Sequence, residues 1–318
     1  MTTASAPTIA INGVDLPPIG IGTWAWGDSL FWSYGKDYGE AQIAGAFHTA
    51  VNAGIKLFDT AEVYGLGESE RIIGRLLKST DQKLYIATKY MPVPWRLGAG
   101  AVRAALDNSL QRLGIEQIDL YQIHQPFSFL VSQKTLLQTL ADAVADGKIG
   151  AIGVSNYSAQ QMTEAHAILA DRGIPLAVNQ VQYSLLARQI ERNGVLETAQ
   201  TLGATILAYS PLAQGLLTGK YNSETVKNKV SGARKLDPRF TQRGLEKILP
   251  VVQLLTQIGE NYNRTPAQVA LNWLIAQGVL PIPGAKSSEQ AQQNAGAFGW
   301  SLSQAELTQL DLLTRSWQ

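Results

Sequence analysis

Short apolar segments rich in β-branched residues alternate with longer amphipathic segments along nearly the whole chain, and few folds accommodate such a pattern. The short segments have the length of buried strands, and the longer ones carry apolar residues at helical spacing. Strands that alternate with helices pair in parallel, which predicts an α/β fold. Eight such strands close into a (β/α)8 TIM barrel, and we expect them at Ile19–Gly22, Lys56–Asp59, Lys83–Thr88, Ile118–Ile123, Ala151–Ser155, Ala177–Gln180, Thr205–Tyr209 and Val279–Pro281.

Helical segments separate these strands, and several end just before a glycine that can close a helix with a positive φ, such as Gly114 or Gly203. Beyond the last strand, leucines at helical spacing predict an extra C-terminal helix on the outside of the barrel, over Leu302–Leu313. The helices expected between the strands are Ala41–Asn52, Glu68–Leu77, Ala101–Leu113, Ser132–Asp146, Ala159–Ala170, Gln189–Leu202 and Gln268–Ala276.

Two segments stand outside the alternation. Thr8–Leu16 has Asn12 and Gly13 at its centre, a pair that suits both positive φ angles of a type I′ turn, and it predicts an N-terminal β-hairpin that plugs the bottom of the barrel. Tyr221–Phe240 is polar and follows the seventh strand, which predicts either a functional mobile loop or a solvated surface excursion. No linker divides the chain, so we expect one domain over residues 1–318.

Composition excludes several classes of function. Charged residues make up 16% of the chain against roughly 25% in an average soluble protein, and 45% are apolar, so a large core is available and a disordered chain is excluded. The 26 basic and 25 acidic residues give a net charge of +1, which provides no electric field to attract a nucleic acid. Because cysteine is absent, disulfides, thiolate zinc sites and cysteine nucleophiles are excluded, and we expect no metal site.

One uncharged run, Thr265–Ala285, has the length of a membrane span but contains three prolines and several side-chain amides. A buried helix followed by a buried strand fits this run better. The first ten residues, MTTASAPTIA, have neither a basic start nor an apolar stretch of signal-peptide length. We therefore expect a cytoplasmic protein with no membrane partner, and a monomer, with an oligomer left open.

Four ionisable residues fall at or beyond the ends of three consecutive predicted strands, where such a barrel has its active site. Asp59 ends the second strand, Tyr64 follows five residues later, Lys89 closes the third strand and His124 the fourth. Each has an ordinary explanation when taken alone: a helix cap for the aspartate, packing for the two rings, and a snorkelling side chain for the lysine. Together they form a coherent acid system.

This system makes a tyrosine a better proton donor. A tyrosine with an ordinary pKa of about 10 protonates an alkoxide poorly near neutral pH. An ammonium group about 4 Å away stabilises the tyrosinate by about 4 kcal/mol at an effective dielectric constant of about 20, enough to lower the pKa of the tyrosine by about three units. Lys89 can supply this charge, with Asp59 keeping it protonated, and a neutral His124 can hydrogen-bond the substrate oxygen. We therefore predict that Tyr64 donates a proton to a carbonyl oxygen.

Seven separated motifs in the chain resemble those of the aldo/keto reductase superfamily, in family order and at matching strand positions. The resemblance is nearest to the branch with bacterial and plant reductases and potassium-channel β-subunits. It implies that Asp59, Tyr64, Lys89 and His124 are a catalytic tetrad, and that the chain reduces aldehydes or ketones to alcohols with NADPH. The motifs are LFDTAEVYG, IATKY, DLYQIHQP, GAIGVSNYS, VNQVQYSLL, AYSPLAQGLLTGKY and PIPGAKSSEQAQQN.

The resemblance also implies a binding site for NADP(H), which the family binds without the G-x-G-x-x-G fingerprint. No such fingerprint follows a predicted strand here. Ser155, Asn156 and Gln180 would hold the nicotinamide carboxamide, and Tyr209 would stack on the ring. The other residues implied at the coenzyme follow the first, seventh and eighth strands: Gly22, Thr23, Trp24, Ser210, Pro211, Leu212, Gly215, Leu217, Gly219, Lys220, Pro283, Gly284, Lys286, Ser287, Gln290, Gln293 and Asn294.

In this interpretation Lys286 sets the coenzyme preference. A cation at the 2′-phosphate favours NADPH over NADH by a charged hydrogen bond of about 1.5–3 kcal/mol. The alternative interpretation is a surface lysine at the start of a helix. The chain departs from the family pattern at Gln293, where many relatives have glutamate, and at Gln290, where others have arginine. These departures concern the affinity for the coenzyme and the choice between NADPH and NADH. They do not affect the proton transfer expected at Tyr64.

Aromatic residues after the first, third and fourth strands predict a substrate pocket above the nicotinamide. An aromatic wall favours planar or apolar carbonyl compounds, and the resemblance supports Trp24 and Trp95 in particular. The predicted pocket residues are Trp24, Trp26, Trp95 and Phe127, with Trp32 and Tyr34 as further aromatic neighbours. Cations that could anchor an acidic substrate are weaker candidates, for which a solvated face is the simpler explanation: Arg96, Lys227, Lys229, Arg234 and Lys235.

Two other functions are weighed against the reductase. The resemblance to potassium-channel β-subunits allows an NADP(H)-binding, redox-sensing module that docks on a partner and has only vestigial catalysis, although a pure sensor would not need the complete tetrad. Lys89 could instead form a Schiff base, as in a barrel aldolase, although the nicotinamide motifs argue against this.

Overall fold

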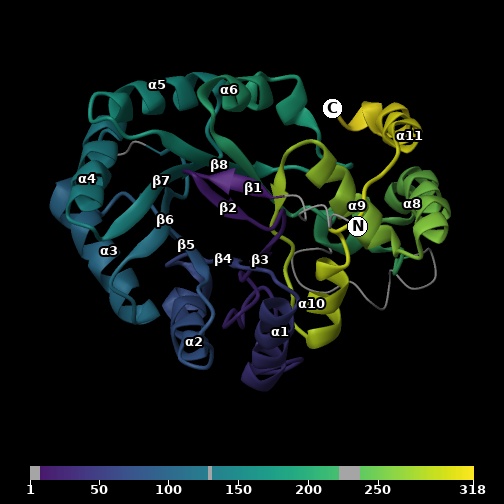
Figure 1. Ribbon diagram of the computed structural model, residues 1–318, viewed down its shortest axis with the longest axis horizontal. Coiled ribbons are helices and arrows are strands. Elements are labelled where there is room, and N and C mark those ends of the chain that lie inside the picture. Colours follow the sequence, from purple (N-terminus) through teal and green to yellow (C-terminus); the bar gives the residue numbers. More distant parts are fainter. Residues whose placement is uncertain (1–7, 128–130, 222–236) are drawn as a thin grey trace, which may run out of the picture.

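The computed structural model describes residues 8–127, 131–221 and 237–318, and within them eight parallel strands form one sheet. Each strand pairs in parallel with the next one along the chain, and the helices lie around the outside of the sheet (Figure 1). The strands are β3 (Gly20–Gly22), β4 (Leu57–Asp59), β5 (Tyr85–Tyr90), β6 (Ile118–Ile123), β7 (Ile149–Ser155), β8 (Leu176–Gln182), β9 (Thr205–Tyr209) and β10 (Leu280–Pro281).

The sheet nearly closes on itself where its first and last strands meet. Gly22 and Gly284 form an isolated parallel bridge, and the Gly22 amide donates to the Pro283 carbonyl at 3.0 Å. A Cβ atom at Gly22 would lie 2.8 Å from the Ile282 carbonyl oxygen, so this backbone approach requires a glycine. The predicted (β/α)8 barrel is confirmed.

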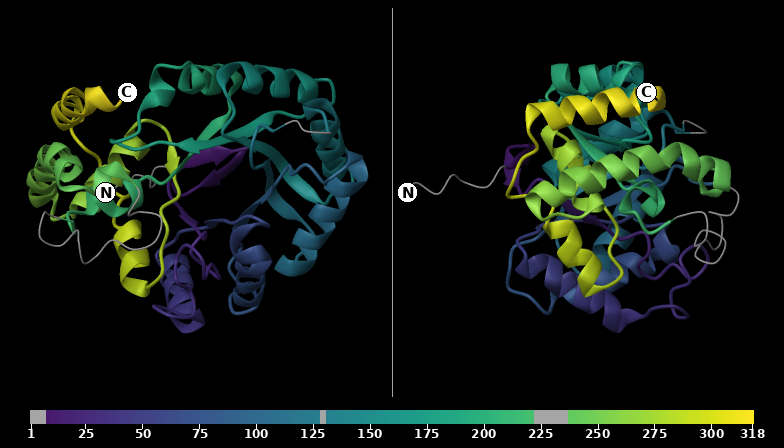
Figure 2. Two further views of the ribbon diagram at one scale, coloured as in Figure 1. Left: turned by 180° about the vertical axis from the view of Figure 1, so that it is seen from behind. Right: turned by 90° about the vertical axis from the view of Figure 1, so that its right-hand side faces the viewer.

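Helices with one apolar face cover the sheet, as in α1, where Ile43, Phe47 and Ala50 are buried. The C-terminal helix, α11, lies beyond the barrel and packs against α8, as the two further views show (Figure 2). The helices are α1 (Glu40–Asn52), α2 (Glu68–Leu77), α3 (Gly98–Leu113), α4 (Gln133–Ala145), α5 (Ala159–Ala170), α6 (Val195–Leu202), α8 (Gln242–Tyr262), α9 (Pro266–Ala276), α10 (Ser288–Ala295) and α11 (Gln304–Thr314). Short 3-10 turns are η1 (Tyr64–Gly67), η2 (Gln189–Glu191), η3 (Ala213–Thr218), η5 (Pro238–Phe240) and η6 (Arg315–Trp317).

The N-terminal hairpin of β1 (Ile9–Ile11) and β2 (Val14–Leu16) closes the bottom of the barrel, as predicted. Asn12 and Gly13 have φ angles of 49° and 77°, as a type I′ turn requires. The buried side chains of Ile11 and Leu16 join the cluster that fills the barrel interior, which also includes Leu57, Leu120, Val178 and Leu207. The interior described here is therefore a packed core, as is usual for such barrels.

The structure differs most from the predicted elements in three places: one expected helix is broken, and α8 and α10 fall where no helix range was predicted. The helix expected over Gln189–Leu202 is broken into η2 and α6, because Gly194 has a φ of 81° and the Asn193 side chain accepts from the Val195 amide to start a new helix. The helix α8, 21 residues long, occupies a stretch where the sequence pattern predicted none. Most of the polar loop expected over Tyr221–Phe240, including Lys227, Lys229, Arg234 and Lys235, lies outside the described residues.

The uncharged run Thr265–Ala285 forms α9 and β10, a buried helix and a buried strand as expected. Across the described ranges of the chain, no helix combines the length and the hydropathy that a membrane span requires.

Candidate active site

The four ionisable residues predicted at the strand ends lie together at the carboxyl-terminal mouth of the barrel. Asp59 is the last residue of β4, Lys89 lies in β5, His124 directly follows β6, and Tyr64 begins η1. The Lys89 ammonium is 2.6 Å from Oδ2 of Asp59 and 5.1 Å from the centre of the Tyr64 ring. The Tyr64 and His124 rings meet edge to face, with their centres 5.8 Å apart.

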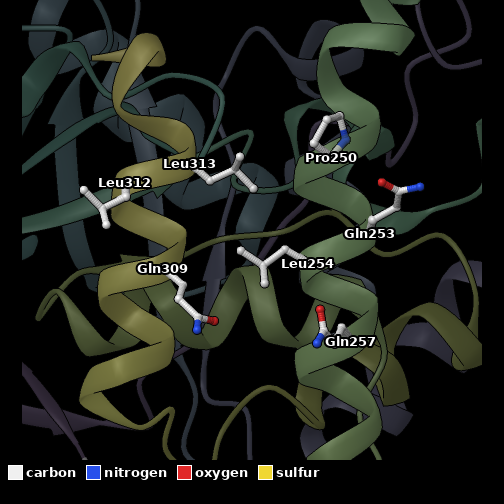
Figure 3. Close-up of a pocket in the computed structure, with 7 residues that line it drawn as sticks. All are labelled: Pro250, Gln253, Leu254, Gln257, Gln309, Leu312 and Leu313. Carbon is white, nitrogen blue, oxygen red and sulfur yellow. The ribbon is translucent and has the colours of Figure 1, made fainter.

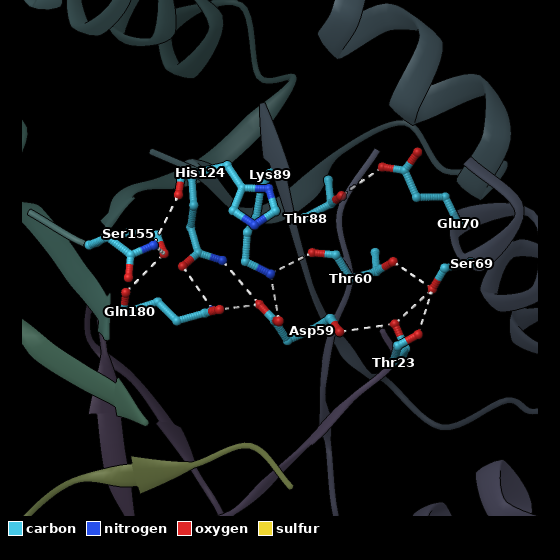
Figure 4. A network of polar contacts seen from close by, with 12 residues as sticks. Thr23, Asp59, Thr60, Ser69, Glu70, Thr88, Lys89, His124, Ser155 and Gln180 are labelled. Carbon is cyan, nitrogen blue, oxygen red and sulfur yellow. Dashed lines mark hydrogen bonds and ion pairs between the residues drawn. The ribbon is translucent and has the colours of Figure 1, made fainter. Parts of the chain in front are cut away.

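Asp59 and Lys89 form an ion pair that is almost fully removed from water, with side-chain exposures of 3% and 0%. Lys89 also donates to the Thr60 carbonyl at 2.7 Å, while the other carboxylate oxygen of Asp59 accepts from Gln122 at 3.1 Å and Gln180 at 2.8 Å (Figure 4). A buried ion pair is tolerated when its remaining lone pairs and protons are hydrogen-bonded. The two glutamines therefore complete the pair.

Gln122 was not predicted as a site residue, although a signal for it exists. Side chains of a strand alternate between its two faces, so Gln122 shares the inner face of β6 with Leu120 and with the position of His124. Leu120 belongs to the apolar interior cluster, and Gln122 is fully buried in the polar layer above it.

Burial and neighbouring charges shift the pKa values of Lys89 and Tyr64 in opposite directions. Burial lowers the pKa of Lys89, but the neighbouring Asp59 and Tyr64 outweigh it and hold that pKa above its ordinary value. Burial raises the pKa of Tyr64, and the Lys89 ammonium offsets only part of this effect. The expected net lowering of the pKa of Tyr64 is thus not found, because desolvation of the phenol exceeds the attraction of the cation. Tyr64 keeps its proton at rest.

His124 is neutral at physiological pH. Burial, assisted by the positive charge of Lys89, lowers its pKa to about 3. Its Nδ1 atom is buried and has no hydrogen-bond partner among the described residues. The neutral ring can therefore donate one hydrogen bond to a substrate oxygen without transferring its proton.

A network of hydroxyl groups supports the strand ends beneath this cluster. The Thr23 hydroxyl donates to the Asp59 carbonyl at 3.0 Å and lies 2.8 Å from the Ser69 hydroxyl, which accepts from the Thr60 hydroxyl (Figure 4). Because Ser69 lies in α2, this helix is tied to the ends of β3 and β4.

An ion pair joins the two loops that flank Tyr64 and Lys89. The Arg96 guanidinium donates to both oxygens of the buried Glu62 carboxylate, at 2.5 and 2.8 Å, and lies 5.1 Å from the Tyr90 ring centre. Glu62 also accepts from the Met91 amide at 2.7 Å. These contacts pair the Arg96 guanidinium with a carboxylate of the chain itself, which argues against Arg96 as an anchor for an acidic substrate.

The predicted nicotinamide residues meet at the ends of β7, β8 and β9. The Tyr209 hydroxyl donates to the Asn156 side-chain oxygen at 3.0 Å, and the Asn156 amide group donates to the Ser155 hydroxyl at 3.1 Å. Gln180 accepts from the Ser155 hydroxyl through its carbonyl, while its side-chain amide is committed to Asp59. Asn156 has a φ of 62°, a strained value for a residue other than glycine and one typical of functional sites.

The residues predicted along the rest of the coenzyme fall into two segments. After β9, Ser210 and Gln214 have positive φ angles of 50° and 57°, and the chain then turns through η3. Pro211 and Leu217 are buried there, Leu212 and Gly215 are partly buried, and Gly219 and Lys220 are exposed.

The second segment runs from Pro283 into α10 and lies beside β3. A Cβ atom added at Gly284 would contact only the Gly22 carbonyl oxygen, at 3.6 Å, so the backbone here is open to a ligand. Ser287 caps α10, Asn294 donates to the Gly284 carbonyl at 3.3 Å, and the side-chain oxygen of Gln290 accepts from the Lys286 amide. Gln293 is exposed.

Three of the four predicted pocket aromatics are exposed at their positions: Trp24 by 41%, Trp95 by 78% and Phe127 by 46%. The Trp24 ring lies roughly parallel to that of Tyr64, with the centres 6.2 Å apart. Trp26 is different, because it is fully buried against Phe58 and donates its indole N–H to the Ala285 carbonyl. The structure does not bring Trp26 to the mouth.

A separate groove of about 660 Å³ runs along the outside of the molecule between α8 and α11 (Figure 3). Its walls are formed by leucine, glutamine and proline side chains, among them Leu254, Gln257 and Leu312. None of the four ionisable residues lines it, so the groove is distinct from the candidate site.

Comparison with known proteins gives a consistent result. The family model described as the aldo/keto reductase family matches residues 18–315. The chloroplastic pyridoxal reductase of Arabidopsis thaliana is 38% identical over 315 residues, covering 95% of this chain and 84% of the relative. The glycerol dehydrogenase of Gluconobacter oxydans superposes with a TM-score of 0.84 at 32% identity, covering 97% of this chain and 95% of that one. A Klebsiella pneumoniae aldo-keto reductase solved in complex with NADPH has a TM-score of 0.76 at 28% identity, covering 98% and 96%.

Proposed function

The chain belongs to the aldo/keto reductase family, and on that premise we propose that it reduces aldehydes or ketones to alcohols with NADPH, with Tyr64 as the proton donor. The family is one of NADP(H)-dependent oxidoreductases. The observation that carries the proposal for this chain is the position of the Lys89 ammonium, which contacts the Asp59 carboxylate at 2.6 Å and lies 5.1 Å from the Tyr64 ring centre.

The residues present fit the coenzyme. Ser155 and Asn156 offer polar groups at the strand ends, Tyr209 offers a ring, and the backbone at Gly284 is open. Lys286 and the N-terminus of α10 offer positive charge to the 2′-phosphate. NADPH, when bound, supplies the hydride that reduces the carbonyl carbon.

The chain's own residues then supply one proton to the substrate. Tyr64 carries its proton at rest and donates it from its hydroxyl to the carbonyl oxygen as negative charge develops there. The Lys89 ammonium stabilises the tyrosinate that results, and Asp59 keeps Lys89 protonated. Neutral His124 hydrogen-bonds the same carbonyl oxygen and orients the substrate.

We expect the substrate to be a planar or apolar carbonyl compound. Trp24 and Trp95 present exposed aromatic surface, and Phe127 adds a further ring after β6. Aromatic aldehydes therefore lead the candidates, and pyridoxal joins them because the Arabidopsis relative is named a pyridoxal reductase.

The two alternative functions are less well supported. The Lys89 ammonium donates to both Asp59 and the Thr60 carbonyl and its pKa is raised, so it is a protonated lysine rather than a Schiff-base nucleophile. A sensing module without catalysis would not need the buried pair between Asp59 and Lys89, whose desolvation is costly.

The test is a panel of carbonyl compounds that includes pyridoxal, an aromatic aldehyde and methylglyoxal, followed by NADPH absorbance. We expect NADPH-dependent turnover with the aromatic members. Tight NADPH binding with negligible turnover on the whole panel would contradict the reductase and favour the sensing module.

We further propose that residues 1–318 act as one domain, as a monomer in the cytoplasm. Sedimentation of the purified chain tests whether it is a monomer, and fractionation of cells that express it tests the compartment. A stable dimer, or recovery with an organelle fraction, would contradict these two statements.

A further inference from the structure

Lys286 lies against two aromatic rings that come from a distant part of the chain. Its Nζ atom is 4.5 Å from the ring centre of Tyr38 and 5.5 Å from that of Trp32. Both distances are within the range of about 6 Å over which a ring face attracts a cation. Lys286 precedes α10, whereas the two rings belong to the segment between β3 and α1, so this contact brings together opposite ends of the described chain.

The ring nearest to Lys286 is held firmly. Tyr38 is buried, its hydroxyl donates to the Ala25 carbonyl at 2.5 Å, and the Tyr34 ring meets it edge to face at 5.8 Å. Trp32 in turn meets Trp24 edge to face at 5.5 Å. The rings therefore form a fixed surface for the side chain of Lys286.

The backbone next to Lys286 is tied to the same segment. The Trp26 indole donates to the Ala285 carbonyl at 2.8 Å, and the Lys286 amide donates to the Gln290 side chain at 2.8 Å. Both ends of the lysine, its backbone and its ammonium, are consequently fixed relative to the start of α10.

We propose that Trp32 and Tyr38 are specificity-determining residues, which hold the Lys286 ammonium in place for the 2′-phosphate of the coenzyme. The inference rests on the proposed function, in which Lys286 faces that phosphate. An unrestrained lysine loses side-chain entropy when it binds an anion, and a lysine already held by rings loses less. Ring faces carry no net charge, so they can position the ammonium and leave its positive charge in place. A carboxylate partner would neutralise that charge.

The test compares the binding of two fragments of the coenzyme, one with the 2′-phosphate and one without it. Isothermal titration calorimetry measures the binding of 2′-phosphoadenosine 5′-phosphate and of AMP, which lacks the 2′-phosphate, to the wild type, Trp32→Leu and Trp32→Phe. We expect Trp32→Leu to weaken binding of the 2′-phosphorylated ligand about three- to tenfold and to change AMP binding by less than about twofold. Trp32→Phe keeps a ring face and is expected to retain most of the preference.

Tyr38 provides a second pair of variants, Tyr38→Leu and Tyr38→Phe, in which only the phenylalanine keeps a ring over Lys286. Tyr38→Phe loses the hydrogen bond to Ala25 and is expected to keep the preference for the 2′-phosphate, whereas Tyr38→Leu is expected to lose part of it. Thermal melting of each variant identifies those that fail to fold, and since Trp32 is only partly buried its variants provide the deciding comparison.

Three outcomes would overturn the inference: equal loss of affinity for both ligands, no change in either, or tighter binding of the 2′-phosphorylated ligand by Trp32→Leu. Tighter binding by Trp32→Leu would mean that the rings hold the Lys286 ammonium away from the 2′-phosphate. Lys286→Met distinguishes this failure from failure of the proposed function. If the wild type prefers the 2′-phosphate and Lys286→Met abolishes the preference, only the role of the rings is rejected; if the wild type shows no preference, the proposed role of Lys286 is rejected as well.

Discussion

The ammonium of Lys89 lies 2.6 Å from the carboxylate of Asp59, and both side chains are almost completely shielded from water. The carboxylate keeps the lysine charged, and the charged lysine faces the ring of Tyr64. The chemistry proposed for the mouth of the barrel depends on this pair, and the predictions below each remove one part of it or of its support.

Replacing Tyr64 with phenylalanine removes the proton donor and keeps the ring. We expect turnover of an aromatic aldehyde, followed by NADPH absorbance, to fall by about 100-fold or more, because a general acid contributes about that much. NADPH binding, followed by fluorescence, should stay within about twofold of wild type, since the proposed coenzyme residues are unchanged. Tyr262→Phe, on α8 far along the chain, is the matched control and should retain full activity. Undiminished turnover by Tyr64→Phe would remove Tyr64 from the mechanism.

Asp59→Asn removes the charge that keeps Lys89 protonated and leaves a side chain of similar size. Burial then lowers the pKa of Lys89 with only Tyr64 left to oppose it, so the ammonium is lost at a lower pH. We expect the alkaline limb of the plot of kcat against pH to move down by at least about one unit. Asp119→Asn, which makes the same change on β6 at a residue that accepts from the Ile86 amide, should leave the limb in place. An unshifted limb in Asp59→Asn would show that this charge does not control Lys89.

His124 links the site to the stability of the fold in acid. Its pKa is lowered to about 3 in the folded chain, against about 6.5 when unfolded, so between these values the unfolded chain binds the extra proton. The free energy of unfolding should therefore fall by up to about 1.4 kcal/mol per pH unit as the pH drops from about 6.5 toward about 3. Urea unfolding at several pH values should show a shallower fall for His124→Gln than for the wild type. Parallel curves for wild type and His124→Gln would contradict this.

Arg96 holds the loop that carries Glu62 and Tyr64. Arg96→Met leaves the buried Glu62 carboxylate with the Met91 amide but without its cation. We expect the free energy of unfolding to fall by about 1–3 kcal/mol, less than for a fully buried pair because the arginine side chain is partly exposed. The double variant Glu62→Gln with Arg96→Met should recover part of this loss in urea unfolding. If the double variant were as unstable as the sum of its single changes, the two residues would not be coupled.

Strand positions could be predicted because each strand is short, apolar and followed by a helix with its own periodic pattern. The β6 and β9 segments coincide with the predicted ranges, and the others differ by one or two residues at one end or both. The helix α8 was not predicted, since it has polar residues at its start and Pro250 inside it. The break before α6 depends on Gly194 and Asn193, whose effect on the backbone is visible only once the helix beside them is in place.

The four site residues could be found from the sequence because strand ends in a barrel converge on one mouth. The hydrogen bonds and ion pairs around them were not predicted, although Gln180 itself was expected at the coenzyme. Gln122 and Gln180 meet at Asp59 from different strands, and Glu62 finds Arg96 across two loops. The direction of the pKa shift of Tyr64 was also missed, because it depends on how much water the folded chain removes from the phenol as well as on the charge beside it.

The bridge between Gly22 and Gly284 closes the barrel by joining a segment near the N-terminus to one near the C-terminus. The first of these segments is synthesised early and the second late. The segments that flank it, Gly22–Trp24 and Gly284–Lys286, cannot meet until the ribosome has delivered almost every residue described here. A nascent chain that stops short of Gly284 therefore contains all four groups of the acid system, but it lacks the Gly284–Lys286 segment that we propose for the coenzyme. The proposed reaction would therefore require the complete barrel.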